Sequence, residues 1–170
     1  MKKHLSILFV LTLVLFPLTS TAQKWVKYEC RDAKFAAQFP MTPEEKVEDS
    51  EQGKSYTATV TQGNTVYMAS ALIHTTNLQV AGLDQQTLAS TSLDAFEKAL
   101  GATKVTKKNY YSRNDVGLDA EIIVPGFANP ILYRVIVIGQ IQYQVVVMQK
   151  EGKAKKGTMY KFINAFKVLK

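Results

Sequence analysis

Few side chains in this sequence are of the kinds that carry out catalysis. Beyond residue 22 the chain holds one histidine, His74, and one cysteine, Cys30. A zinc site built from such ligands needs three or four of them, and a serine or cysteine triad would need His74 as its base. The sequence also lacks a GxSxG elbow, a P-loop and a GxGxxG turn. It therefore predicts no metal site, no cofactor and no nucleophilic triad.

His74 and Cys30 each have a plainer interpretation. We expect His74 to lie at the end of a strand or in a loop, and Cys30 to be a small buried side chain on a strand. In an oxidising compartment a lone thiol cannot form a disulfide within its own chain, so the core must hold the fold together. The alternatives for Cys30 are an intermolecular disulfide or a reactive thiol.

Asp119 and Glu121 are the best remaining candidates for catalysis. Alternation along a strand places both carboxylates on one face, about 7 Å apart, a spacing that suits the paired carboxylates of a glycosidase. The other interpretation is a solvated or salt-bridged strand face, with Arg134 as a partner for either acid across the sheet. We expect the second arrangement, so no catalytic residue is predicted and a hydrolase is the least favoured function.

Positive charge is concentrated in the second half of the chain. The formal net charge is +7, and residues 23–97 carry a net negative charge while residues 98–170 carry a net positive one. The segment KEGKAKKG at 150–157 groups four lysines, Lys150, Lys153, Lys155 and Lys156. The plainer interpretation is a charged loop that keeps the protein soluble. If the chain has a partner-binding surface, these four lysines are its candidates, and the partner would be anionic.

The first 22 residues have the pattern of a secretory signal peptide. Lys2 and Lys3 precede an apolar run from Leu5 to Leu18, and Ser20 and Ala22 supply small residues before a cut at Gln23. The alternative, an uncleaved membrane anchor, would need roughly 20 apolar residues. We therefore expect residues 23–170 to form a single periplasmic or secreted domain with no integral membrane segment, and an exported protein is not expected to bind nucleic acid.

The rest of the sequence predicts strands joined by short turns, with two helices. Helices are expected over 84–100, with Asp84 and Gly101 as its caps, and over 156–170. Pro40 cannot donate to a sheet ladder and should end its strand, and the polar stretch 42–55 should be a loop. The strands are expected at 25–30, 34–39, 55–61, 65–74, 104–111, 117–124, 131–138 and 141–149.

The strands at 131–138 and 141–149 are apolar on both faces, apart from Arg134. Such strands need cover on both sides, which two amphipathic helices on opposite faces would supply. Hairpin-length turns make the sheet mostly antiparallel. The predicted fold class is α+β, with a mostly antiparallel sheet covered by helices on both faces in a three-layer α/β/α sandwich.

This order of elements resembles the PsbP-like superfamily, including its exported bacterial DcrB-like members. The resemblance extends from Tyr28 to Val168. It implies an antiparallel sheet flanked by helices that serves as a non-catalytic accessory or adaptor domain, and it carries over no histidine-based metal site. The residues that carry it are mostly structural: Phe35, Phe39, Pro40, Pro43, Gly117, Glu121, Arg134, Tyr143, Phe162 and Phe166.

Two functions follow as expectations. The leading one is an exported, non-enzymatic adaptor that contacts a protein or an anionic envelope component through its surface. The alternative is a domain that binds a small molecule or an ion in a pocket between the sheet and a helix.

Overall fold

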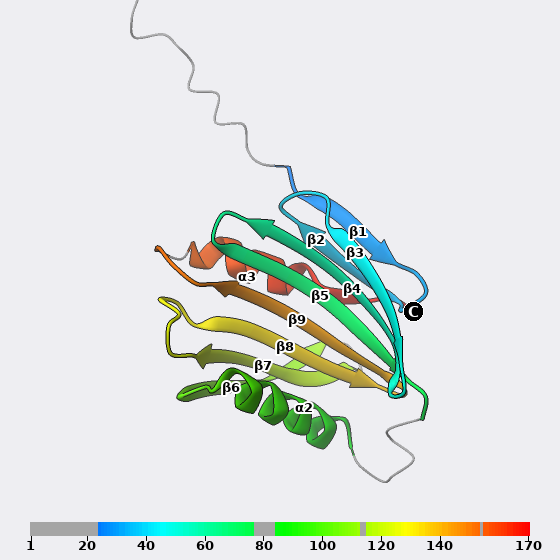
Figure 1. Cartoon of the computed structure of the whole chain (residues 1–170). Coiled ribbons are helices and arrows are strands. Elements are labelled where there is room, and N and C mark those ends of the chain that lie inside the picture. The colour runs from blue at the N-terminus through cyan, green and yellow to red at the C-terminus, as the bar shows by residue number, and fades with distance from the viewer. Residues whose placement is uncertain (1–23, 77–83, 113–114, 154) are drawn as a thin grey trace, which may run out of the picture.

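A computed structural model describes residues 24–76, 84–112, 115–153 and 155–170. The predicted signal peptide at 1–22 lies outside these residues. Within them the chain forms two antiparallel sheets and two helices (Figure 1).

The larger sheet contains, in spatial order, β3 (Glu44–Ser50), β4 (Gly53–Gln62), β5 (Thr65–His74), β9 (Ile141–Gln149), β8 (Ile131–Ile138), β7 (Asp115–Ile123) and β6 (Lys104–Ser112). The smaller sheet contains β1 (Val26–Cys30), β2 (Phe35–Phe39) and β10 (Lys167–Val168). The helices are α2 (Gln85–Leu100) and α3 (Lys156–Ala165).

Turn and cap residues place most of these elements where the sequence predicts them. Gly63 and Gly139 have positive φ in the two-residue turns before β5 and β9, which is the conformation that short hairpins require. Asp84 accepts a hydrogen bond from the Thr87 amide at the start of α2, and Gly101 ends that helix in the left-handed conformation. The predictions for β8, β9 and both caps of α2 are confirmed.

Two predicted boundaries are wrong. The stretch 42–55 is not a loop, because it contains β3 and the start of β4. Every residue of β3 is exposed, since it forms one edge of the larger sheet, and so its composition resembles that of a loop. The final helix ends at Ala165 and not at residue 170, because Lys167 and Val168 pair with Ala36 and Phe35 of β2.

The predicted three-layer α/β/α sandwich is also wrong. Strands hold 54% of the described residues and helices only 19%. A ten-residue helix such as α3 is about 15 Å long and about 10 Å wide, whereas a seven-stranded sheet is roughly 29 Å wide. The smaller sheet therefore covers much of the face that a helix was expected to cover, and α3 lies beside it.

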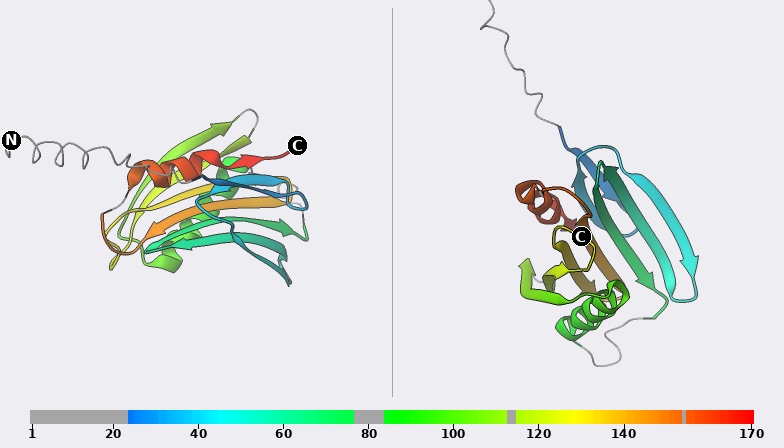
Figure 2. Two further views of the ribbon diagram at one scale, coloured as in Figure 1. Left: turned by 90° about the horizontal axis from the view of Figure 1, so that it is seen from above. Right: turned by 60° about the vertical axis from the view of Figure 1, so that its left-hand side comes forward.

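The two faces of the larger sheet pack into two separate cores. On one face α2 contacts β7 and β8, and Phe96 of α2 stacks on Tyr133. On the other face, aromatic side chains of β2 and α3 meet β5 and β9, as in the contacts of Phe162 with Phe39 and Tyr67. Figure 2 (left) shows α3 and β10 lying between the β1–β2 pair and the β6–β7 pair.

Cys30 and Pro40 behave as the sequence predicts. Cys30 is buried in the core that contains Phe35 and Phe39, with 8% of its surface exposed. Strand β2 ends at Phe39, directly before Pro40. Both residues therefore have structural roles.

Candidate functional site

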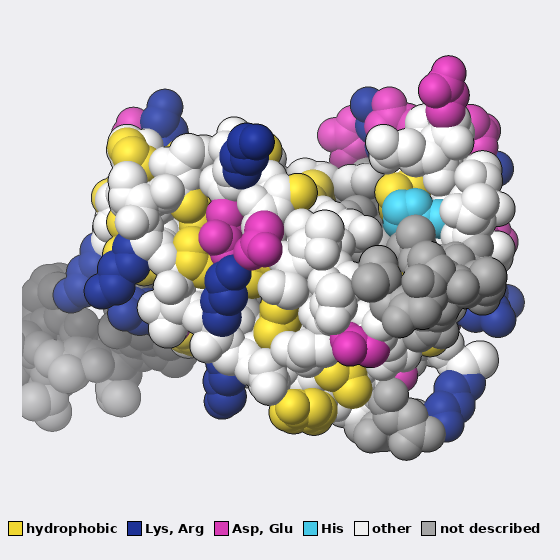
Figure 3. All heavy atoms as spheres, turned by 90° about the horizontal axis from the view of Figure 1, so that it is seen from below, with side chains coloured by type: hydrophobic (Ala, Val, Ile, Leu, Met, Phe, Trp, Pro, Cys, Tyr) yellow, Lys and Arg dark blue, Asp and Glu magenta, His cyan; other side chains and the backbone are white. Residues whose placement is uncertain are grey.

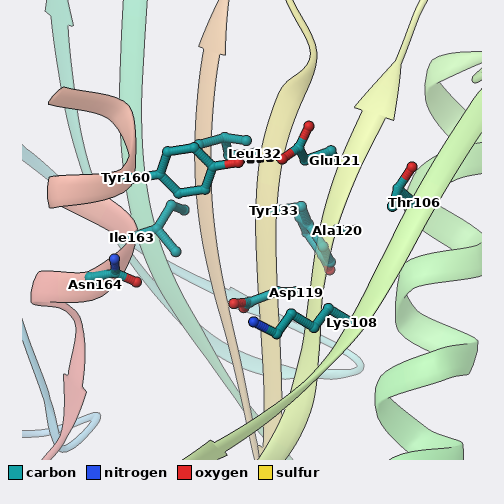
Figure 4. Close-up of a pocket in the computed structure, with 10 residues that line it drawn as sticks. All are labelled: Thr106, Lys108, Asp119, Ala120, Glu121, Leu132, Tyr133, Tyr160, Ile163 and Asn164. Carbon is teal, nitrogen blue, oxygen red and sulfur yellow. Dashed lines mark hydrogen bonds between the residues drawn. The ribbon is translucent and has the colours of Figure 1, made fainter. Parts of the chain in front are cut away.

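A groove lies between α3 and the β6–β7–β8 part of the larger sheet (Figure 4). It encloses about 400 Å³. Ile163 and Leu132 give it apolar surface, and polar side chains of β6, β7 and α3 surround them. The full lining is Thr106, Lys108, Asp119, Ala120, Glu121, Leu132, Tyr133, Tyr160, Ile163 and Asn164.

The pairing of β6 with β7 sets the polar side of this groove. Thr106 lies opposite Glu121, and Lys108 lies opposite Asp119. Because side chains alternate along a strand, these four residues share the sheet face that α3 covers. Opposite charges directly across an antiparallel pair attract each other, and Figure 4 shows the amino end of Lys108 pointing towards Asp119.

Arg134 fixes the floor of the groove and is 4% exposed. Its Nε donates to Asp119 Oδ1 at 2.6 Å, and its Nη2 donates to Asp119 Oδ2 at 2.8 Å. Nη1 donates to the main-chain oxygen of Ile163 at 2.8 Å, which ties β8 to α3. The guanidinium also lies 4.0 Å from the centre of the Tyr110 ring. One side chain thus joins β6, β7, β8 and α3.

Glu121 accepts a hydrogen bond from the hydroxyl of Tyr160 across the groove (Figure 4). Tyr160 is 39% exposed, so this contact lies at the rim of the groove. The hydrogen bond to Glu121, together with partial burial, raises the pKa of Tyr160 to about 12, because the neutral phenol is the form that can donate.

This pair gives a pH-dependent prediction. In the Glu121→Gln variant we expect the pKa of Tyr160 to fall from about 12 towards 10.0, because the amide carries no negative charge to oppose the phenolate. Since the pKa is raised in the folded state, the stabilisation is complete below pH 10 and is lost as the pH rises towards 12. Ultraviolet difference titration against Tyr160→Phe isolates the signal, and Glu48→Gln serves as the control. An unchanged titration of Tyr160 in Glu121→Gln would contradict this account.

The carboxylates considered for catalysis are both engaged. Both oxygens of Asp119 accept hydrogen bonds from the buried guanidinium of Arg134. The sequence predicts that Arg134 pairs with one of these two acids. Glu121 accepts a hydrogen bond from Tyr160. An Asp119 held in this way is not available as a nucleophile or a base. Thr106 and Lys108 are the two polar side chains by which β6 lines the groove. Among the described residues, no ion pair includes Lys108.

A second cavity of about 350 Å³ is lined by the next residues of β6 on the same face and by the segment that follows α3. Tyr110 lines this second cavity and contacts Arg134, which holds Asp119 of the first. The remaining lining residues of the second cavity are Ser112, Asp115, Phe166, Lys167, Val168 and Lys170.

The predicted partner-binding lysines lie on the loop between β9 and α3. Lys150, Lys153, Lys155 and Lys156 are all exposed. Lys156 lies one helical turn before Tyr160, so it shares the side of α3 that faces the groove. The structure thus places this basic loop beside one mouth of the groove.

His74 lies at the end of β5, on the other face of the sheet, and it lines a separate hollow with Phe96 and Gln142. No group of three or more metal-binding side chains occurs in the part of the chain that the structure describes. Figure 3 shows this face of the molecule, with acidic side chains gathered at the corner formed by β3. The acidic residues of that strand are Glu44, Glu45, Glu48 and Asp49.

Sequence reasoning missed Lys108, Thr106, Tyr160 and Asn164 as site residues. Period-two alternation on β6 does place Thr106, Lys108 and Tyr110 on one face, but nothing local shows that α3 will lie across from them. The buried residues of α3 are Met159, Phe162 and Ile163, and Tyr160 does not belong to this apolar stripe.

A scan against models of known protein families finds no match, and a search of curated proteins finds no relative. The resemblance to the PsbP-like superfamily stays a prediction. Within the described residues, neither helix has the length and apolar character needed to cross a membrane.

Proposed function

We propose that the chain is an exported, non-enzymatic adaptor that binds an anionic partner in the groove between α3 and the larger sheet. The observation that carries this proposal is which charged groups of the groove already have a partner within the protein. Asp119 is neutralised by Arg134 and Glu121 is bound by Tyr160. Lys108, outside any ion pair among the described residues, is then the charge best placed to meet a ligand.

The basic loop supports the same partner chemistry. Lys153, Lys155 and Lys156 are exposed beside one mouth of the groove, and each lysine near an anionic surface contributes up to about 1 kcal/mol. Salt screens such exposed charges over roughly 8–10 Å. We infer that the loop attracts an anionic protein or envelope component and that the groove then holds it.

Export is supported by the signal-like pattern of residues 1–22, and we therefore expect the proposed partner in the periplasm or outside the cell. The absence of a catalytic role is supported by the engaged state of Asp119 and Glu121. His74 lies on the opposite face of the sheet, away from both carboxylates.

A small molecule is the second candidate for the same groove. Its volume of about 400 Å³ falls within the range of roughly 300–1,000 Å³ that is common for small-molecule sites. A thermal-shift screen distinguishes the two candidates, because a small ligand that fits the groove would raise the melting temperature on its own. A screen in which no compound class stabilises the protein would count against this second candidate.

Capture of partners from envelope extract tests the adaptor proposal. Three double variants are compared with the wild type. The groove variant is Lys108→Glu/Lys156→Glu, and the loop variant is Lys153→Glu/Lys155→Glu. The control is Lys46→Glu/Lys54→Glu on the far β3–β4 side, which changes the net charge by the same amount. We expect the groove variant to lose the partner that the wild type captures and the control to capture it normally. The loop variant should capture less of the partner at low salt, and raised salt should reduce this difference from the wild type because it screens the loop charges. Equal capture by all three would remove the proposal.

A further inference from the structure

The two cavities follow each other along one face of β6, and we call them the first and second sections of the groove. Alternate residues of β6 line both, with Thr106 and Lys108 in the first section and Tyr110 and Ser112 in the second. Six residue steps along a strand span roughly 20 Å. Arg134 holds Asp119 of the first section and contacts the Tyr110 ring of the second, so the two sections adjoin at these side chains. A groove of this length suits an extended chain better than a compact molecule.

Strand β10 lies on the side of the groove opposite β6, and one of its two edges is not paired with another described strand. Among the described residues, β10 pairs only with β2. The amide of Leu169 donates to the main-chain oxygen of Lys34 at 2.8 Å, so Lys167 and Leu169 direct their backbone groups towards β2. In an antiparallel ladder the residue between them, Val168, directs its N–H and C=O to the other side. Val168 lines the second section of the groove.

The charges along the groove favour an acidic occupant. Lys108 lines the first section, and Lys167 and Lys170 line the second. The acids facing them are Glu121, which accepts from Tyr160, and Asp115. Asp119 is neutralised by Arg134, and the exposed Lys156 adds positive charge at the mouth.

We propose that this groove takes an extended acidic segment of a partner polypeptide, which pairs through its backbone with Val168 of β10 and places carboxylates against Lys108 and Lys167. This inference rests on the proposed function and specifies its partner. Backbone pairing at an open strand supplies affinity, and the pockets for alternate side chains supply specificity. The aromatic rings of Tyr110 and Phe166 provide apolar surface between the lysines.

Fluorescence polarisation with purified chain 23–170 tests this inference. The probe is a labelled seven-residue peptide in which glutamates alternate with valines. The same peptide with N-methylated central amides cannot donate to Val168, and an oligogalacturonate offers the same number of carboxylates without a peptide backbone. We expect the unmodified peptide to bind at least about tenfold more tightly than either comparison ligand, a difference of the size that follows from one or two lost hydrogen bonds.

Protein variants provide the matched test. Val168→Pro removes the N–H that faces the groove and leaves the pairing of Lys167 and Leu169 with β2 in place. It should therefore lower the affinity for the unmodified peptide about tenfold. Lys108→Glu/Lys167→Glu should lower this affinity by at least as much, and Lys46→Glu/Lys54→Glu should change it less than about twofold. If Val168→Pro does not fold, the N-methylated peptide still decides the question.

Three outcomes would overturn the inference. The N-methylated peptide could bind as tightly as the unmodified peptide, the oligogalacturonate could bind as tightly as the unmodified peptide, or the unmodified peptide could fail to bind at low salt. The proposed function is judged separately by the capture experiment. If the groove variant loses its partner while the peptide fails here, the anionic partner stands and its identity as an extended peptide is wrong.

Discussion

Replacing Asp119 with alanine is expected to lower the free energy of unfolding by about 3 kcal/mol. The variant would leave the guanidinium of Arg134, whose side chain is 5% exposed, without its negative partner. Removing one member of a buried ion pair costs about 3–5 kcal/mol. We expect the lower end of this range because the Asp119 side chain is 32% exposed, so water can reach part of the space it leaves.

Urea denaturation at pH 7, followed through Trp25 fluorescence, measures this loss. The control is Glu48→Ala, which removes the exposed Lys46–Glu48 pair and should cost no more than about 1 kcal/mol. The double variant Asp119→Leu/Arg134→Met should recover most of the stability lost by Asp119→Ala, since no buried charge remains. If Asp119→Ala costs no more than Glu48→Ala, Arg134 does not hold the groove together in the way described.

Replacing Phe162 with alanine is expected to lower the free energy of unfolding by about 3–5 kcal/mol. Its side chain is fully buried, and its ring centre lies 4.9 Å from that of Phe39 and 5.3 Å from that of Tyr67. Phe39 belongs to the smaller sheet and Tyr67 to the larger one. Phe162 therefore joins α3 to both sheets, and its removal leaves a cavity where all three meet.

Phe96→Ala is the matched control, because it removes the same side chain from the other helix. Phe96 stacks on Tyr133 but is only partly buried, so its loss should cost less than that of Phe162. Guanidinium denaturation followed by circular dichroism compares the two variants. A larger cost for Phe96→Ala would mean that the core between the sheets and α3 is not the main support of the fold.

The strands could be predicted because their signals are local. Alternating side chains, Gly63 and Gly139 in two-residue turns, and Pro40 after β2 each act over a few residues. The cover of the larger sheet could not be predicted in the same way. Phe35 and Phe39 have the alternation of any half-buried strand, and nothing in that pattern shows that β2 packs across the larger sheet and not beside it.

Strand β3 was missed for a different physical reason. As an exposed edge strand it has no buried face, so it lacks the alternation by which strands are recognised. Its charges are also what an edge strand needs to avoid pairing with other chains. The same composition therefore fits a solvated loop and a protected edge.

The candidate site could be predicted only in part. The pairing of Arg134 with Asp119 follows from adjacent strands, and the register places the two residues opposite each other. Lys108 and Tyr160 line the same cavity only because α3 returns across the sheet after three intervening strands. That arrangement depends on tertiary packing, which residue spacing does not encode.

Amide NMR spectra of isotopically labelled chain 23–170, recorded during titration with the acidic seven-residue peptide, test the central claim most directly. If the groove is the binding surface, the largest shift changes will fall on Lys108 of β6, Tyr160 of α3 and Val168 of β10. The claim would be contradicted if the saturable chemical-shift changes were centred on β3 or on the hollow beside His74 and the amide signals of Lys108, Tyr160 and Val168 did not shift.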